Sequence, residues 1–177
     1  MYLKTSLEEK RRRERVRIFS LAIGIGLLPP LWAVVSPILG IKVGAVALVC
    51  AGIFSANGNK VEDSIRISVG FAVSVFWGCL ALHLINILPW NKSVNQFVTL
   101  GFMGAVAVFI ANSRLKKFIY LPSWLCGWAI TIGILGETPM NLWGYLPISI
   151  LISMVVGVIY VGIGVLAFGR FLNKLLT

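Results

Sequence analysis

The residues best suited to chemistry in this 177-residue chain are its single histidine and an asparagine close behind it. His83 and Asn86 are three positions apart, a spacing that makes them neighbours on the surface of a helix. An ionisable group inside an apolar segment is a functional candidate, so His83 could act as a proton-sensitive gate or as a hydrogen-bonding station for a solute. The alternative is a neutral His83 whose ring is satisfied by a neighbouring helix.

A proline pair, Pro29-Pro30, lies within the first long apolar run, residues 18–36. Proline has no backbone N–H, so the carbonyls of Ile25 and Gly26 lose their usual helical donors near the middle of a membrane-length segment. Broken backbone in lipid is tolerated where it is buried in protein or lines a wet cavity. We therefore expect a helix break here that faces the working centre of the protein. A packing kink relieved by neighbouring helices is the alternative.

We expect the remaining reactive side chains to form no enzyme or metal site. Cys50, Cys79 and Cys126 all lie in apolar runs without a CxxC pair, which favours small core residues over metal ligands or disulfides. No P-loop, dinucleotide, zinc-protease or serine-hydrolase motif is present. We expect no catalytic residue, no metal and no cofactor. No carboxylate lies inside an apolar run, which disfavours an ion-coupled carrier.

The composition places the chain in a membrane. Hydrophobic residues make up 58% and charged residues 12%, against about 25% charged residues in soluble domains. The formal charge of +10 resides between the apolar runs, where basic residues set topology, so we expect the lipid bilayer and no nucleic acid as partner.

Six apolar segments can be divided along the chain. We expect a basic cytoplasmic N-terminal helix over residues 1–17, a six-segment all-α membrane domain over 18–169 and a basic cytoplasmic tail over 170–177. The second and fifth segments are short: the 14 residues of 43–56 reach about 21 Å as a helix, against a hydrocarbon core of about 30 Å. The segments are approximately 18–36, 43–56, 65–88, 97–112, 122–135 and 147–168.

The basic residues fix an orientation for these six segments. With the N-terminus inside, fourteen of the sixteen lysines and arginines fall on the inner side, and only Lys42 and Lys92 fall outside. This distribution obeys the positive-inside rule and predicts that both termini are cytoplasmic.

Three spans followed by three more predict a 3+3 inverted repeat, in which the two short segments occupy corresponding places. Short segments interrupted by glycine or proline at matching positions indicate a site at the repeat interface. We therefore expect the two short segments to face each other and line a pathway; the alternative is a chance likeness between stretches of small apolar residues. The aromatic rings could narrow such a pathway or serve as packing. The pathway candidates are Ile25, Gly26, Pro29, Pro30, Trp32, Cys50, His83, Asn86, Pro122, Trp124, Cys126 and Thr131.

A family resemblance is carried by the start of the fifth and sixth segments. The stretch IYLPSWLCG from Ile119 to Gly127, and Leu146-Pro147 followed by Gly157 and Tyr160, are its main elements. With Leu31-Trp32 and the second segment, the chain resembles the YcdZ-like inner-membrane proteins, domain-of-unknown-function family 1097. Members typically have Pro-Gly where this chain has Pro122-Ser123. The resemblance implies a bacterial inner (cytoplasmic) membrane and supplies no activity.

These observations predict a passive channel or facilitator for a small, mostly uncharged solute such as urea, ammonia or a short organic molecule. Six short spans enclose little volume, so we also expect a homo-oligomer. The alternative is a membrane scaffold that does not transport and recruits a partner through its basic N-terminal segment.

Overall fold

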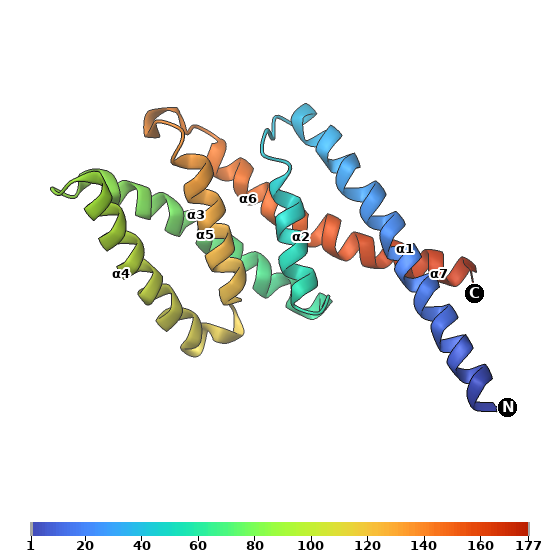
Figure 1. Ribbon diagram of the computed structural model, residues 1–177. Coiled ribbons are helices and arrows are strands. Elements are labelled where there is room, and N and C mark those ends of the chain that lie inside the picture. The colour runs from blue at the N-terminus through green and yellow to red at the C-terminus, as the bar shows by residue number, and fades with distance from the viewer. Residues whose placement is uncertain (1, 177) are drawn as a thin grey trace.

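The computed structural model describes the backbone of residues 2–176 and the side chains of residues 11, 14–16 and 18–174. All regular structure in this part of the chain is helical (Figure 1). The elements are α1 (Tyr2–Ile38), α2 (Val46–Ala56), η1 (Val61–Asp63), α3 (Ser64–Ile87), α4 (Lys92–Asn112), η2 (Arg114–Lys117), α5 (Leu121–Leu135), η3 (Met140–Leu142), α6 (Leu146–Val156), η4 (Gly157–Ile163) and α7 (Gly164–Leu176).

Within the part of the chain that the structure describes, four apolar stretches of helix are long enough to cross a membrane, and two apolar helices are shorter. The long stretches are Glu14–Ile38, Val61–Ile87, Lys92–Asn112 and Leu146–Lys174. The short ones are α2 and α5, with 11 and 15 residues. The predictions of an all-α membrane protein and of two short middle segments are therefore confirmed. Pro122 lies in the first turn of α5, where its missing N–H costs no helical bond.

Helix α1 is continuous, so the predicted break at Pro29-Pro30 is wrong. The helix runs through Pro29, Pro30 and Pro37 without a change of conformation (Figure 1). The φ angle of proline, near −65°, is itself helical, and each ring removes one backbone hydrogen bond while the turns on either side keep theirs. Packing of α1 against α7 and η4 supports the segment. The carbonyls of Ile25 and Gly26 still lack their i+4 donors.

The last apolar segment is a single rod made of α6, η4 and α7. The helix does not end near Phe168 but continues to Leu176, so most of the predicted tail is helical. The middle of the rod, η4, is a π-helix of seven residues. A Cβ at Gly157 would lie 2.7 Å from the Cα of Ala47, which shows how closely the backbones of η4 and α2 approach.

Helices α3 and α5 pack through small residues that repeat every four positions. Gly70, Ser74 and Gly78 of α3 meet, in the same order, Ser123, Gly127 and Thr131 of α5. Because the pairs advance along both helices together, α3 and α5 are parallel. Small-xxx-small patterns of this kind permit close backbone approach in lipid.

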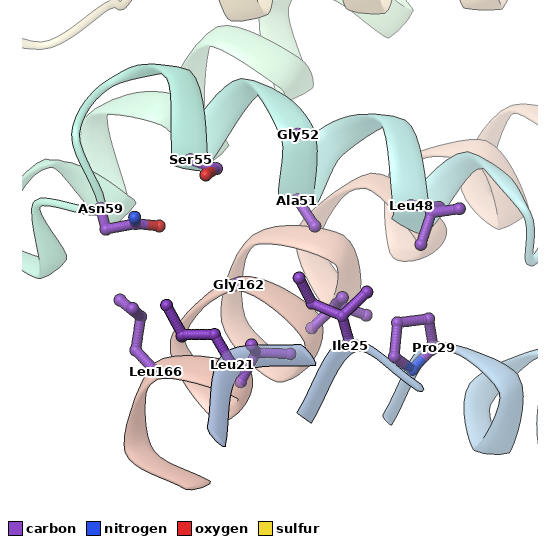
Figure 2. A pocket seen from close by; sticks show the side chains of 12 residues that line it. Leu21, Ile25, Pro29, Leu48, Ala51, Gly52, Ser55, Asn59, Gly162 and Leu166 are labelled. Carbon is purple, nitrogen blue, oxygen red and sulfur yellow. The ribbon is translucent and has the colours of Figure 1, made fainter. Parts of the chain in front are cut away.

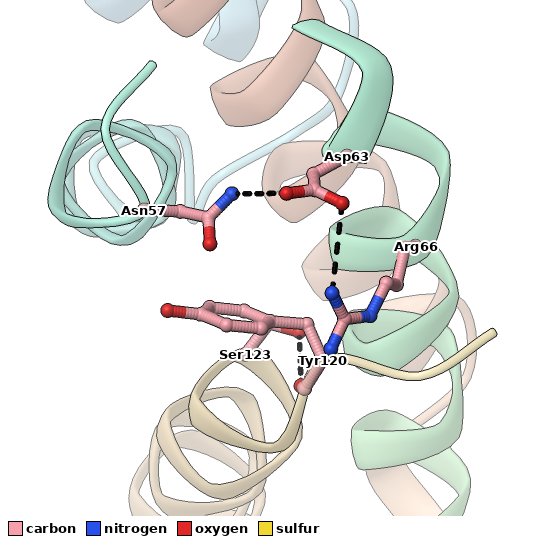
Figure 3. Close-up of polar contacts among 5 residues, drawn as sticks. All are labelled: Asn57, Asp63, Arg66, Tyr120 and Ser123. Atoms are coloured by element: carbon pink, nitrogen blue, oxygen red, sulfur yellow. Dashed lines mark hydrogen bonds and ion pairs between the residues drawn. The ribbon is translucent and has the colours of Figure 1, made fainter. Parts of the chain in front are cut away.

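The beginnings of α3 and α5 are joined by a polar cluster to the end of α2 (Figure 3). Asn57 donates from Nδ2 to Asp63 Oδ2 at 2.8 Å, and Asp63 pairs with Arg66 at 3.5 Å. The guanidinium of Arg66 lies 5.4 Å from the centre of the Tyr120 ring. These contacts hold the three elements together at one end of the bundle, the end opposite to Asn86.

The helices form two lateral groups that share a core. Helix α1 packs on η4 and α7, and α2 packs on η4 and α6, while α3 packs on α4, α5 and α6. Helices α1 and α4 lie at opposite edges of the molecule (Figure 1). The shared core contains Phe54, Phe71, Ile150, Met154 and Val158, all fully buried.

Candidate functional site

A pocket of about 280 Å³ lies between α1, α2 and the η4–α7 part of the rod (Figure 2). We call it the α1–α2 pocket. Each of the three elements contributes one side, and the side chains of Leu21 and Ile25 project into it from α1. The pocket is lined by Leu21, Ile25, Pro29, Leu48, Ala51, Gly52, Ser55, Asn59, Val161, Gly162, Val165 and Leu166.

The lining of the α1–α2 pocket is apolar except at one end. Ser55 and Asn59 supply a hydroxyl and an amide there, and none of the charged side chains that the structure describes lines the pocket. Asn59 adopts a left-handed conformation, with φ of 59°, in the turn after α2. Pro29 cannot donate to the carbonyl of Ile25, so α1 adds a backbone acceptor without a helical partner. The pocket can therefore hold a small molecule with an apolar body and a hydrogen-bonding end.

Gly52 keeps the α1–α2 pocket open. A Cβ at Gly52 would meet no heavy atom within 4 Å, so the space beside it is empty. Gly162 of η4 also lines the pocket, but a Cβ there would meet the buried ring of Phe54 at 2.7 Å, so this glycine makes room for the core. Gly162 and Val161 belong to a π-helical segment, and such segments occur frequently at functional sites.

A second pocket, of about 300 Å³, lies where α3 and α5 end. We call it the Asn86 pocket. Asn86 donates from Nδ2 to the Leu82 carbonyl at 2.8 Å and contacts Met140 Sδ at 3.6 Å. The Trp143 indole N–H donates to the carbonyls of Leu135 and Thr138 at 3.2 and 3.0 Å. The lining residues are Leu82, Asn86, Leu135, Gly136, Glu137, Thr138, Pro139, Met140 and Trp143.

The structure distributes the predicted pathway residues over different places. Ile25 and Pro29 line the α1–α2 pocket, and Asn86 lines the other. Gly26 and Pro30 lie on the outward side of α1, in a shallow apolar groove with Phe168. Pro122 and His83 are exposed, and His83 lines neither of the two pockets.

Three other predicted residues belong to the packed core. Cys50 is fully buried against Phe54 and Met154 in the shared core. Thr131 donates from Oγ1 to the Gly127 carbonyl at 2.7 Å within α5. Trp124 packs edge-on against Trp77, with ring centroids 5.3 Å apart, and its buried indole N–H has no hydrogen-bond partner among the described residues.

Trp32 and Cys126 occupy helix contacts. The Trp32 indole N–H donates to the Gly44 carbonyl at 3.1 Å, and its ring lies 6.4 Å from that of Tyr160, which ties α1 to the turn before α2 and to the rod. Helices α2 and α5 contact each other, but no residue of α5 lines the α1–α2 pocket.

Among the lining residues that sequence reasoning missed are Gly52, Ser55 and Asn59 on one pocket and Glu137 on the other. All four stand next to predicted features: Gly52 and Ser55 follow Cys50 in the short second segment, and Asn59 and Glu137 are in turns. The sequence does not indicate which face of α2 meets α1, because both faces of α2 are apolar.

Comparisons with known proteins place most of the chain in one family. Residues 22–169 match the family described as "Protein of unknown function (DUF1097)". No curated protein and no solved structure gives a significant match.

Proposed function

The chain belongs to the DUF1097 family, and we propose that it is a passive membrane facilitator for a small, mostly uncharged solute that binds in the α1–α2 pocket. The pocket itself is the observation that carries this proposal. Its volume of about 280 Å³ is close to the lower end of small-molecule sites, about 300 Å³. An apolar wall with a few convergent polar groups is the usual composition of such sites.

The lining favours an uncharged solute with an apolar part. A charged solute would lose its hydration without an opposite charge on the wall, which costs several kcal/mol. Ser55 and Asn59 can hydrogen-bond a hydroxyl or amide at one end. Among the expected solutes, a short organic molecule fits this apolar lining better than urea, because the polar groups of urea cover its whole surface.

The proposal includes six membrane segments arranged as an inverted repeat. Its support is the pairing of helices: α3 packs on α5 and α4, and the α6–η4–α7 rod packs on α2 and α1. Under the repeat, α1, α2 and the rod correspond to α4, α5 and α3. Alignment of α2 with α5 on Cys50 and Cys126 then pairs Gly52 with Trp128.

The repeat would explain why only one half carries the α1–α2 pocket. In the other half, the space between α4, α5 and α3 is filled by Trp77, Trp124 and Trp128, which pack with Met103 and Ala107 of α4. Gly52 and Leu48, the counterparts of Trp128 and Trp124, leave the corresponding space open. The pocket is thus a departure from the symmetry, as expected for a site that binds something.

We place the protein in the bacterial inner membrane with both termini in the cytoplasm. The distribution of basic residues supports this orientation, and the polar cluster around Arg66 would then lie at the cytoplasmic surface. The outward faces of α1 and α4 are strongly apolar, including Val34, Phe97 and Phe109, each about 70–80% exposed. Lipid and further copies in a homo-oligomer would cover them.

Uptake of solutes into liposomes tests the proposed function. The full chain is reconstituted, and stopped-flow uptake is recorded for urea, ammonia, glycerol, short alcohols and short amides, with empty liposomes as the baseline. We expect selective uptake that is greatest for solutes with an apolar part. Flat traces from correctly inserted protein for every solute would overturn the proposal.

The continuity of α1 gives specific support to a scaffold as the second candidate. As one 37-residue helix, α1 is about 55 Å long, whereas the hydrocarbon core is about 30 Å thick. Its basic N-terminal part would project from the membrane as a helical surface for a partner. In that case deletion of residues 1–10 abolishes the cellular function, while substitutions in the α1–α2 pocket have no effect; a facilitator shows the reverse pattern.

A further inference from the structure

We propose that the Asn86 pocket binds a small organic ammonium ion, that is, a protonated alkylamine. This site is separate from the α1–α2 pocket and does not depend on which solute the latter takes. It lies at the other end of α3 from the Arg66 cluster and is built from the ends of α3 and α5 together with the turn that follows α5.

The charge distribution around the Asn86 pocket favours a cation. Helices α3 and α5 are parallel and both end at the pocket, so the negative ends of two helix dipoles converge there. Glu137 adds a carboxylate, and no lysine, arginine or histidine among the described residues lines the pocket. Glu137 forms no ion pair with any described residue, so its charge is uncompensated. The other five acidic residues of the chain lie elsewhere, at positions 8–14 and 62–63.

The polar side chains of the Asn86 pocket offer hydrogen-bond acceptors, and that of Asn86 is held in place. The Asn86 amide nitrogen is committed to the Leu82 carbonyl and Met140 Sδ, which leaves the amide oxygen available to accept a bond. Thr138 adds a hydroxyl oxygen. An ammonium group offers N–H donors only, so a carboxylate, an amide oxygen and a hydroxyl are suitable partners for it.

The apolar part of the Asn86 pocket distinguishes an organic ammonium ion from a metal ion. Leu82, Leu135 and Met140 present carbon and sulfur atoms, and Trp143 presents an indole whose N–H is occupied by two carbonyls. An indole ring attracts organic cations. A calcium ion would require six to eight oxygen ligands, and no cluster of three or more potential metal-binding side chains occurs in the described part of the chain.

Isothermal titration calorimetry on the purified full chain in detergent tests this proposal. The ligand is n-butylammonium chloride, and 1-butanol is the uncharged control with the same chain length. We expect n-butylammonium to bind and butanol to bind much more weakly. Glu137→Gln should weaken n-butylammonium binding about fivefold, the effect of one partly exposed ion pair worth about 1 kcal/mol.

Glu62→Gln is the matched control, because Glu62 is exposed at the opposite end of α3 and should leave the affinity unchanged. Thr138→Val is a second variant, which removes an acceptor without changing the net charge and should also weaken binding. Equal affinity for n-butylammonium and butanol, or equal loss in the Glu137 and Glu62 variants, would overturn the proposal. Because binding in detergent involves no transport, failure of this site and failure of the facilitator are separate results.

Discussion

Replacement of Gly52 by tryptophan is expected to abolish solute uptake by reconstituted protein. The space beside Gly52 is empty, so the indole enters the α1–α2 pocket rather than the packed core. Tryptophan is also the residue that the proposed repeat places at the equivalent position, Trp128. An indole in a pocket of about 280 Å³ leaves too little room for a solute to pass, and we expect uptake to fall at least tenfold towards the rate of empty liposomes.

Gly133→Trp is the control for this experiment. Gly133 lies in the helix α5 and is exposed, and a Cβ added there would also meet no heavy atom within 4 Å. The same glycine-to-tryptophan change at this position enlarges the outer surface and leaves the α1–α2 pocket open, so uptake should stay at the wild-type rate. If Gly52→Trp transports as well as the wild type while both variants are equally helical, the pocket is not on the route of the solute.

Replacement of Gly157 by valine is expected to lower the free energy of unfolding more than any exposed glycine substitution. Even the first added carbon would lie 2.7 Å from the Cα and 2.8 Å from the carbonyl carbon of Ala47, and these backbone atoms cannot rotate away. Overpacking of this kind costs about 1–3 kcal/mol, and a contact with backbone belongs at the upper end of that range. Unfolding of the purified protein by increasing SDS in mixed micelles measures the loss.

The matched control for Gly157→Val is Gly101→Val on α4. Gly101 is helical and faces open space, so the same change there should be nearly neutral. If both variants unfold at the same SDS fraction, α2 does not depend on close contact with η4. In addition, Gly157→Ala should lie between the wild type and Gly157→Val, since it adds the clashing carbon without the branched methyl groups.

The membrane character of the chain and its short middle helices could be predicted from the sequence, because segment length and apolar content are local properties. The turn at Asn57-Gly58 and the start of α5 at Pro122 follow equally from local chemistry. The straight path of α1 could not be predicted from the sequence. A proline pair weakens a helix, but packing against α7 and η4 decides whether the helix bends.

The candidate site was predictable only in part. The proline pair led to four candidates, of which Ile25 and Pro29 line the α1–α2 pocket, whereas Gly26 and Pro30 lie on the other side of the same helix. Cys50 stands next to Ala51 and Gly52, and only the direction in which α2 faces separates a core residue from two pocket residues. That direction is set by tertiary contacts. The spacing of apolar residues cannot predict it when both faces of a helix are apolar.

The π-helical segment also decides how the rod accommodates its own length. One residue turns an α-helix by about 100°, whereas the wider i→i+5 turns of a π-helix rotate less per residue, so the seven residues of η4 turn the rod about as far as six α-helical residues would. Removal of a single residue from 157–163 would therefore restore ordinary α-helical turns and leave Val165 and Leu166 on the wall of the α1–α2 pocket. In this way η4 absorbs a one-residue difference in chain length locally and keeps the direction of the side chains on α7.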